Sequence, residues 1–243
     1  MKKLSLIILT CLPVFMHAQN RISDHNSIGW YALFVTPKIN DKLSGHFDYQ
    51  WRRSDIISNW QQSLLRVGLT YKIDNQVSAQ VGYAWIKTFV YGDYSIIAVP
   101  KPFPEHRIYE QIQITTPVGR TTLTHRLRLE QRWLGRFKSM ESPKADDWIF
   151  LNRFRYMPRL DVPLDKNWYA AMYDEIFIGF GKQVGENVFD QNRLAVMLGY
   201  KFSKTVRLEG GFLSQIVQLP REIDNKNVFQ YNNGIVVNTY LSF

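Results

Sequence analysis

The sequence predicts an all-β fold, a single antiparallel transmembrane β-barrel of about twelve strands, with about ten as the alternative. Three observations support it. Apolar and polar residues alternate at period two, the alternating segments exceed ordinary strand length, and short connections alternate with long ones. A soluble β-sandwich would show the same alternation in shorter strands, with its apolar faces turned inward.

The chain begins with a predicted export signal. Two lysines precede a mainly apolar stretch over residues 4–16, and Ala18 offers a cleavage point. We therefore expect a signal peptide over residues 1–18 and the outer-membrane β-barrel over residues 19–243. A membrane anchor is the weaker alternative, because a spanning helix needs roughly 20 apolar residues. Cys11 is the only cysteine, so cleavage leaves no disulfide or cysteine metal site.

The predicted mature chain is basic. The whole sequence has 30 lysines and arginines against 21 aspartates and glutamates, and removing Lys2 and Lys3 leaves 28 basic residues and a net charge of +7. Basic charge suggests a nucleic-acid partner, but an exported protein meets lipopolysaccharide phosphates and anionic solutes first. The expected partners are therefore outer-membrane lipid, lipopolysaccharide and the barrel assembly machinery, and not nucleic acid.

Each predicted strand has one apolar face. In chain order the segments are residues 27–37, 41–52, 60–72, 76–89, 106–117, 121–135, 147–162, 166–180, 188–202, 204–219 and 228–243. Typical apolar faces are Leu43, Phe47, Tyr49 and Trp51, then Leu65, Val67, Leu69 and Tyr71, then Leu194, Val196, Leu198 and Tyr200. Bacterial single-chain barrels have even strand numbers. We therefore expect about twelve strands, the segment before Lys38 being the least well defined.

The connections between these segments differ in length. Residues 38–40, 73–76, 118–120, 163–165 and 203 form short links, and residues 53–59, 90–105, 136–146, 181–187 and 220–226 form longer ones. Short periplasmic turns and long extracellular loops are typical of outer-membrane barrels. The chain ends on a strand whose apolar face carries Leu241 and Phe243. Such an aromatic end is a barrel-assembly signal.

Five stretches in a fixed order form a further pattern. They are residues 62–71 (QSLLRVGLTY), 125–133 (HRLRLEQRW), 152–156 (NRFRY), 174–176 (DEI) and 189–194 (FDQNRL). Together they resemble the domain-of-unknown-function 2490 family of Bacteroidota outer-membrane proteins. The resemblance covers nearly all of the mature chain. It implies a barrel in the outer membrane and brings no established activity and no catalytic residues.

The faces opposite the apolar ones are rich in arginine and are predicted to line the lumen. The predicted lumen residues are Arg66, Arg107, Arg126, Arg128, Glu130, Arg132, Arg153, Arg155, Glu175, Arg193, Arg207 and Glu209. One interpretation is an Arg/Glu network that closes the lumen, which is favoured because unpaired buried charge is expensive. The other is a narrow path whose positive field attracts anionic solutes.

Catalysis and metal binding have little support in the sequence. His125 lies on the lipid-facing side without a serine motif, and His46 with Asp48 lacks a third ligand. Phosphate loops, zinc spacings and calcium loops are missing from the sequence. We therefore expect no enzyme, no cofactor and no metal.

Residues 90–105 form the longest predicted loop, with three prolines and several apolar residues. The loop can plug the lumen, meet a partner outside or pack on its own rim, and the sequence leaves all three alternatives open. As a whole, the sequence predicts an outer-membrane barrel whose specific role is unknown. Passive transport of small anionic solutes is the leading hypothesis. A lumen-closed structural or surface-interaction barrel is the alternative, and a lipid-modifying enzyme is less favoured.

Overall fold

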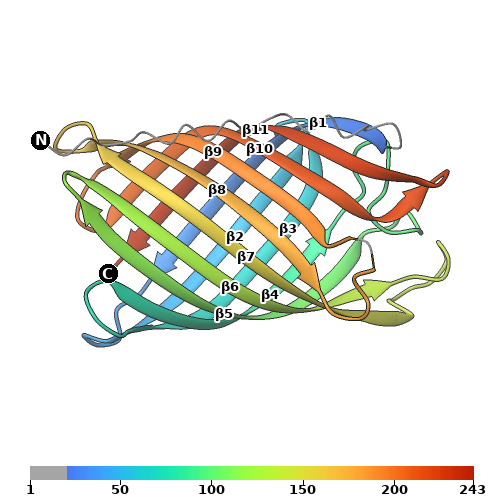
Figure 1. Ribbon diagram of the computed structural model, residues 1–243, viewed down its shortest axis with the longest axis horizontal. Coiled ribbons are helices and arrows are strands. Elements are labelled where there is room, and N and C mark those ends of the chain that lie inside the picture. Colours follow the sequence, from blue (N-terminus) through green and yellow to red (C-terminus); the bar gives the residue numbers. More distant parts are fainter. Residues whose placement is uncertain (1–20, 186) are drawn as a thin grey trace, which may run out of the picture.

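The described part of the chain forms a closed β-barrel (Figure 1). The computed structural model describes residues 21–185 and 187–243, so the predicted signal peptide over residues 1–18 lies outside the described residues. The strands are β1 (Arg21–Thr36), β2 (Leu43–Ser54), β3 (Asn59–Lys72), β4 (Val77–Thr88), β5 (Phe103–Val118), β6 (Thr121–Arg136), β7 (Asp147–Pro163), β8 (Trp168–Phe180), β9 (Phe189–Lys201), β10 (Val206–Ile223) and β11 (Lys226–Ser242). No helix among the described residues is long and apolar enough to span a membrane.

The barrel closes through a parallel pair of strands. β1 pairs with β11 in one continuous parallel register, from Arg21 opposite Asn227 to Thr36 opposite Ser242. The remaining neighbours along the sheet pair antiparallel. The prediction of about twelve strands is therefore wrong for the described residues, which form eleven. That prediction assumed that the first and last strands pair antiparallel, which requires an even number of strands. A single parallel pair permits an odd number of strands.

Two connections at the end of the barrel that carries the long loops, called the loop end, are shorter than predicted. The predicted link over residues 220–226 is a turn of Asp224 and Asn225, whose φ angles are 52° and 57°. Aspartate and asparagine tolerate this left-handed geometry, which suits tight hairpins. The link between β2 and β3 is also short. The strict alternation of short and long connections therefore fails, and the long ones are residues 89–102, 137–146 and 181–188.

Four turns at the opposite end of the barrel are stabilised by the same kind of side-chain hydrogen bond. A side-chain oxygen of the residue that opens the turn accepts hydrogen bonds from the backbone N–H groups two and three residues later. The residues are Asn40, Asp74, Asp165 and Ser203. Such side-chain turns fix where the chain reverses and hence the register of each hairpin.

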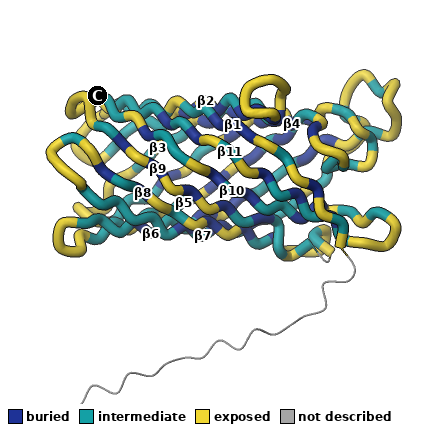
Figure 2. Tube along the Cα trace, turned by 90° about the horizontal axis from the view of Figure 1, so that it is seen from above, coloured by how far each residue is buried: buried dark blue, intermediate teal, exposed yellow. Residues whose placement is uncertain are grey.

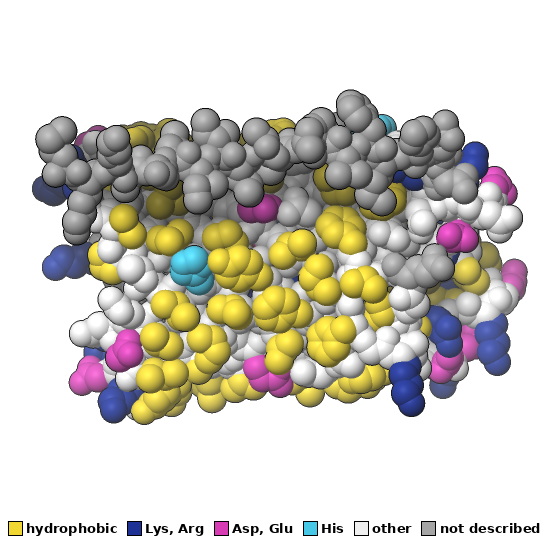
Figure 3. Space-filling model, viewed as in Figure 1, with side chains coloured by type: hydrophobic (Ala, Val, Ile, Leu, Met, Phe, Trp, Pro, Cys, Tyr) yellow, Lys and Arg dark blue, Asp and Glu magenta, His cyan; other side chains and the backbone are white. Residues whose placement is uncertain are grey.

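The two faces of the sheet differ in chemistry. Figure 2 shows buried and more exposed residues alternating along the strands. Outward side chains are mainly apolar, and Val67, Val81 and Val196 are 44%, 52% and 53% exposed. In Figure 3 a broad hydrophobic field covers the side of the barrel, and lysine, arginine, aspartate and glutamate gather mainly at its two ends.

The inside of the barrel also has two sides. On β8 to β11 and β1, inward residues form an apolar cluster that includes Trp30, Met197 and Leu213. On β2 to β7, the inward residues are mainly charged or amide side chains, such as Gln50 and Arg128. Charged groups therefore concentrate along one wall of the lumen.

Replacing Asp74 or Asp165 with alanine is expected to lower the free energy of unfolding at neutral pH. Backbone N–H groups, from Gln76 and Trp168 respectively, hold the pKa of each carboxyl below its ordinary value. Stability from a lowered folded-state pKa is present above the unfolded pKa and is lost as the pH falls through the folded-state pKa. Urea unfolding at neutral pH and at about pH 2 measures the difference. Asparagine at these positions is the control that keeps an acceptor, and equal losses at both pH values would contradict the assignment.

Candidate functional site

The strands enclose a cavity that runs along the barrel. Its volume is about 850 Å³. Residues from both ends contribute to its wall, including Ser44 and Thr122 near the short turns and Gln61 and Phe103 near the long loops. The cavity is therefore a single space, and side chains from each of the eleven described strands line it.

The predicted lumen residues all have their side chains inside the barrel. Ten of the twelve line the cavity, and these are Arg66, Arg107, Arg126, Arg128, Arg132, Arg153, Arg155, Glu175, Arg193 and Arg207. Glu130 and Glu209 are 1% and 0% exposed and lie behind the cavity wall. The pleat accounts for this placement, because alternate residues of a strand point to the same face.

Glu130 is shared by several arginines near the middle of the charged wall. Its oxygens lie 3.3 Å from Arg107 Nη1, 2.6 Å from Arg153 Nη2 and 2.5 Å from Arg155 Nη1. Arg128 Nη1 lies farther away, at 3.9 Å. A fully buried carboxylate is costly unless it is paired and hydrogen-bonded, and these contacts satisfy it.

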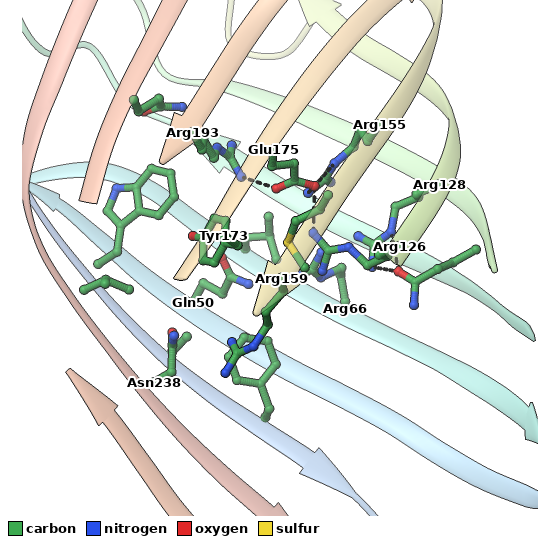
Figure 4. A pocket seen from close by; sticks show the side chains of 18 of the residues that line it. Gln50, Arg66, Arg126, Arg128, Arg155, Arg159, Tyr173, Glu175, Arg193 and Asn238 are labelled. Carbon is green, nitrogen blue, oxygen red and sulfur yellow. Dashed lines mark hydrogen bonds and ion pairs between the residues drawn. The ribbon is translucent and has the colours of Figure 1, made fainter. Parts of the chain in front are cut away.

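Glu175 forms a second centre on β8. It accepts hydrogen bonds from Arg126 Nη2 at 2.7 Å and from Arg155 Nη2 at 2.7 Å. Arg193 Nη1 lies 3.9 Å away. Figure 4 shows the three arginines around this carboxylate. Arg155 also pairs with Glu130 and so joins the Glu130 and Glu175 centres.

Glu209 forms a third centre near the short turns. It accepts from Arg159 Nη2 at 2.5 Å, Tyr169 Oη at 2.8 Å and Tyr240 Oη at 2.9 Å. Tyr169 reaches it by lying flat over Gly199, where a Cβ atom would come within 2.2 Å of the phenol carbon Cζ. The absence of a side chain at Gly199 thus makes room for a buried hydrogen bond.

The cavity wall carries a large excess of positive charge. Of the described residues that line it, twelve are arginines and one is lysine, against four aspartates and glutamates. Three further carboxylates, Asp48, Glu130 and Glu209, are at most 1% exposed and do not line the cavity. The charged groups that a solute in the lumen meets are therefore mainly guanidinium groups.

Some of these arginines contact amides and aromatic rings in place of carboxylates. Arg52 donates to Gln50 and Gln62, and its guanidinium lies 3.8 Å from the centre of the Trp30 ring. Arg207 lies 4.1 Å from the centre of the Tyr240 ring. Arginine suits such stacked positions because its planar group is weakly hydrated. Its charge there is held in place without being neutralised.

Several site residues are missing from the prediction. Arg159 shares the period-two face of Arg153, so the sequence pattern could have identified it. Glu105 belongs to β5, which begins before the predicted segment. Asp190 carries no such signal, because a register shift in the β8–β9 pairing turns it inward, where it pairs with Arg153.

The longest loop crosses the barrel end. Tyr91 donates to Gln230 on β11 at 3.0 Å and accepts from Asn232 at 3.2 Å. The carbonyl oxygen of Ser95 accepts from an arginine of β10 at 3.0 Å. Of the three alternatives for this loop, the structure has the inward one, because Tyr91 and Ile96 line the cavity at this end.

His46 and Asp48, the inward pair that the sequence offered as a possible metal site, belong to the charged wall. His46 Nε2 lies 2.8 Å from Asp48 Oδ2, and Asp48 also accepts from Arg66 at 2.8 Å. Within residues 21–185 and 187–243, no group of three or more histidines, cysteines, aspartates or glutamates is arranged to hold a metal ion. Asp48 is therefore ion-paired with Arg66 and hydrogen-bonded to His46.

Replacing Arg153 with glutamine is expected to lower the free energy of unfolding by about 3 kcal/mol, because Asp190 and Glu130 both lose a buried partner. The matched control is Arg128→Gln on the same wall. Its hydrogen bonds go to Gln111, so we expect a loss of about 1 kcal/mol. Urea unfolding of the refolded barrel in detergent measures both, and equal losses would show that carboxylate pairing does not separate the two arginines.

Comparison with known proteins identifies a family. The family model described as "Protein of unknown function (DUF2490)" matches residues 28–227, a range that runs from β1 into β11. The resemblance of the five ordered stretches is thereby confirmed. No curated protein matches the sequence. A solved structure of the NanC porin, in a rhombohedral crystal form, is similar with 9% identity and a TM-score of 0.49, over 89% of this chain and 98% of that one.

Proposed function

The chain belongs to the DUF2490 family of proteins of unknown function, and we propose that it is an outer-membrane barrel that passes small anionic solutes by passive diffusion. One observation carries the proposal. Among the described residues, the cavity wall has twelve arginines and one lysine against four carboxylates. A wall of one charge sign in a low-dielectric surround concentrates counter-ions, and pore-lining charges set ion selectivity.

The outer surface supports a membrane location. The strands are 12 to 18 residues long, against the 9 to 11 that a tilted strand needs to cross a bilayer. Large outward side chains such as Val67 and Val196 are about half exposed. In water, a contiguous apolar field of this size promotes association, whereas hydrocarbon is its natural solvent.

The size limit on the solute comes from two parts of the fold. Residues 89–102 narrow the loop end through Tyr91 and its bonds to β11. Inside, the apolar cluster around Trp30 and Met197 occupies one wall. The cavity that remains, about 850 Å³ in volume, suits small solutes better than polymers.

A closed structural barrel is the second candidate. The sharing of Glu130 and Glu175 among arginines of β5, β6, β7 and β9 favours it, because these contacts tie the wall together. Both candidates are passive. The ring nitrogens of His46, His106 and His125 contact Asp48, Tyr83 and Tyr156.

Planar-bilayer recording from the refolded barrel is expected to give a small anion-selective conductance. Replacing Arg52 and Arg207 with glutamine should move the reversal potential toward that of the cation. Both side chains line the cavity, and their removal leaves no carboxylate without its partner. Lys38→Gln, on an exposed turn, is the control and should leave selectivity unchanged. A folded barrel without conductance would favour the closed alternative.

Replacing Phe243 with lysine is expected to reduce barrel assembly more than the same change at Ser242. Phe243 is 69% exposed, whereas its backbone carbonyl accepts from the Lys38 N–H at 2.5 Å. The substitution therefore changes the terminal aromatic side chain and leaves the backbone contact available. The amount of folded, heat-modifiable protein in the outer-membrane fraction measures assembly. Equal effects at the two positions would argue against a terminal aromatic signal.

A further inference from the structure

Two arginines that line the cavity each have a buried hydrogen-bond donor without a partner. The atoms are Arg126 Nε and Arg128 Nη1, two of five such side-chain donors in the described part of the chain. Arg128 is 3% exposed. Native proteins satisfy nearly all their buried polar groups, so a cluster of unsatisfied donors points to a missing acceptor.

The surrounding residues hold this cluster rigidly. Tyr109 on β5 lies against Gly82, where a Cβ atom would come within 2.4 Å of the phenol oxygen. The Arg128 guanidinium lies 4.4 Å from the centre of the Tyr109 ring. Gln111 accepts from Arg128 Nε at 3.0 Å and from Nη2 at 2.6 Å. The guanidinium plane of Arg128 is therefore fixed by a ring and an amide, neither of which neutralises its charge.

The carboxylates nearby are already committed to other arginines. Arg126 shares Glu175 with Arg155, and Glu130 accepts from three arginines while lying 3.9 Å from Arg128. Figure 4 shows Arg66, Arg126 and Arg128 gathered on one side of the cavity. The cluster thus keeps a net positive charge in a confined space, where an anion is the favourable partner.

We propose that Arg126 and Arg128 bind one compact oxyanion, the carboxylate or phosphate group of a small solute, inside the cavity. Guanidinium groups match the oxygen geometry of carboxylates and phosphates, and charge-assisted hydrogen bonds are the stronger ones. The site rests on the proposed function, as the place where the lumen selects its solute. Binding itself, however, needs access from only one end of the cavity.

The test measures binding in the absence of a membrane. The refolded mature chain in detergent is titrated with sodium phosphate and, in a second series, with sodium acetate, at constant ionic strength set by sodium chloride. A ligand that binds the folded state raises the thermal unfolding midpoint, and calorimetric titration gives the affinity. Arg128→Gln is expected to weaken the affinity by about tenfold or more.

Arg132→Gln is the matched control. Arg132 lies on the same strand and lines the same cavity, but it pairs with Glu105 at 2.8 Å, so this variant should keep the wild-type affinity. Stabilisation by phosphate alone assigns the site to phosphate groups, and stabilisation by acetate alone assigns it to carboxylates. No stabilisation by either anion would overturn the proposal, as would equal losses in Arg128→Gln and Arg132→Gln. Binding without any bilayer conductance would refute the proposed transport and leave the binding site standing.

Discussion

The parallel pair between β1 and β11 is the contact on which the rest of the barrel depends. It joins the first and last strands over the full length of β1 and so leaves neither strand with an unpaired edge. Closure also gives every strand an inner and an outer face. Only then do the polar residues of strands far apart in sequence, such as Arg66 and Glu175, meet in one enclosed space.

Within that space, arginine has two different roles. Arg153 and Arg155 are paired with buried carboxylates, which largely neutralise their charge. These ion pairs hold β6, β7 and β8 together. Arg52 and Arg128 are held by amides and aromatic rings, so their charge stays available to a solute. The difference lies in the partner and not in the residue type, because a glutamine or a ring positions a guanidinium without neutralising it.

The positions of most lumen residues could be predicted because the strand pleat is local. Once Arg126 and Arg128 are assigned to one face, Glu130 and Arg132 must share it. The partners of these residues could not be predicted, because they come from other strands and depend on the stagger between them. Asp190 shows the limit most clearly. Its face is set by a register shift against β8, which leaves no periodic trace in the sequence.

By itself, the sequence determined the β architecture, the outward apolar faces and the inward arginines, because each follows from alternation along one strand. The tertiary structure alone decided the odd strand number, the inward path of residues 89–102 and the division of arginines into paired and unpaired groups. These features depend on contacts between residues far apart in the chain, such as β1 with β11 and Tyr91 with Gln230. Local periodicity carries no information about such contacts, since it repeats within a strand and is silent about which strands become neighbours.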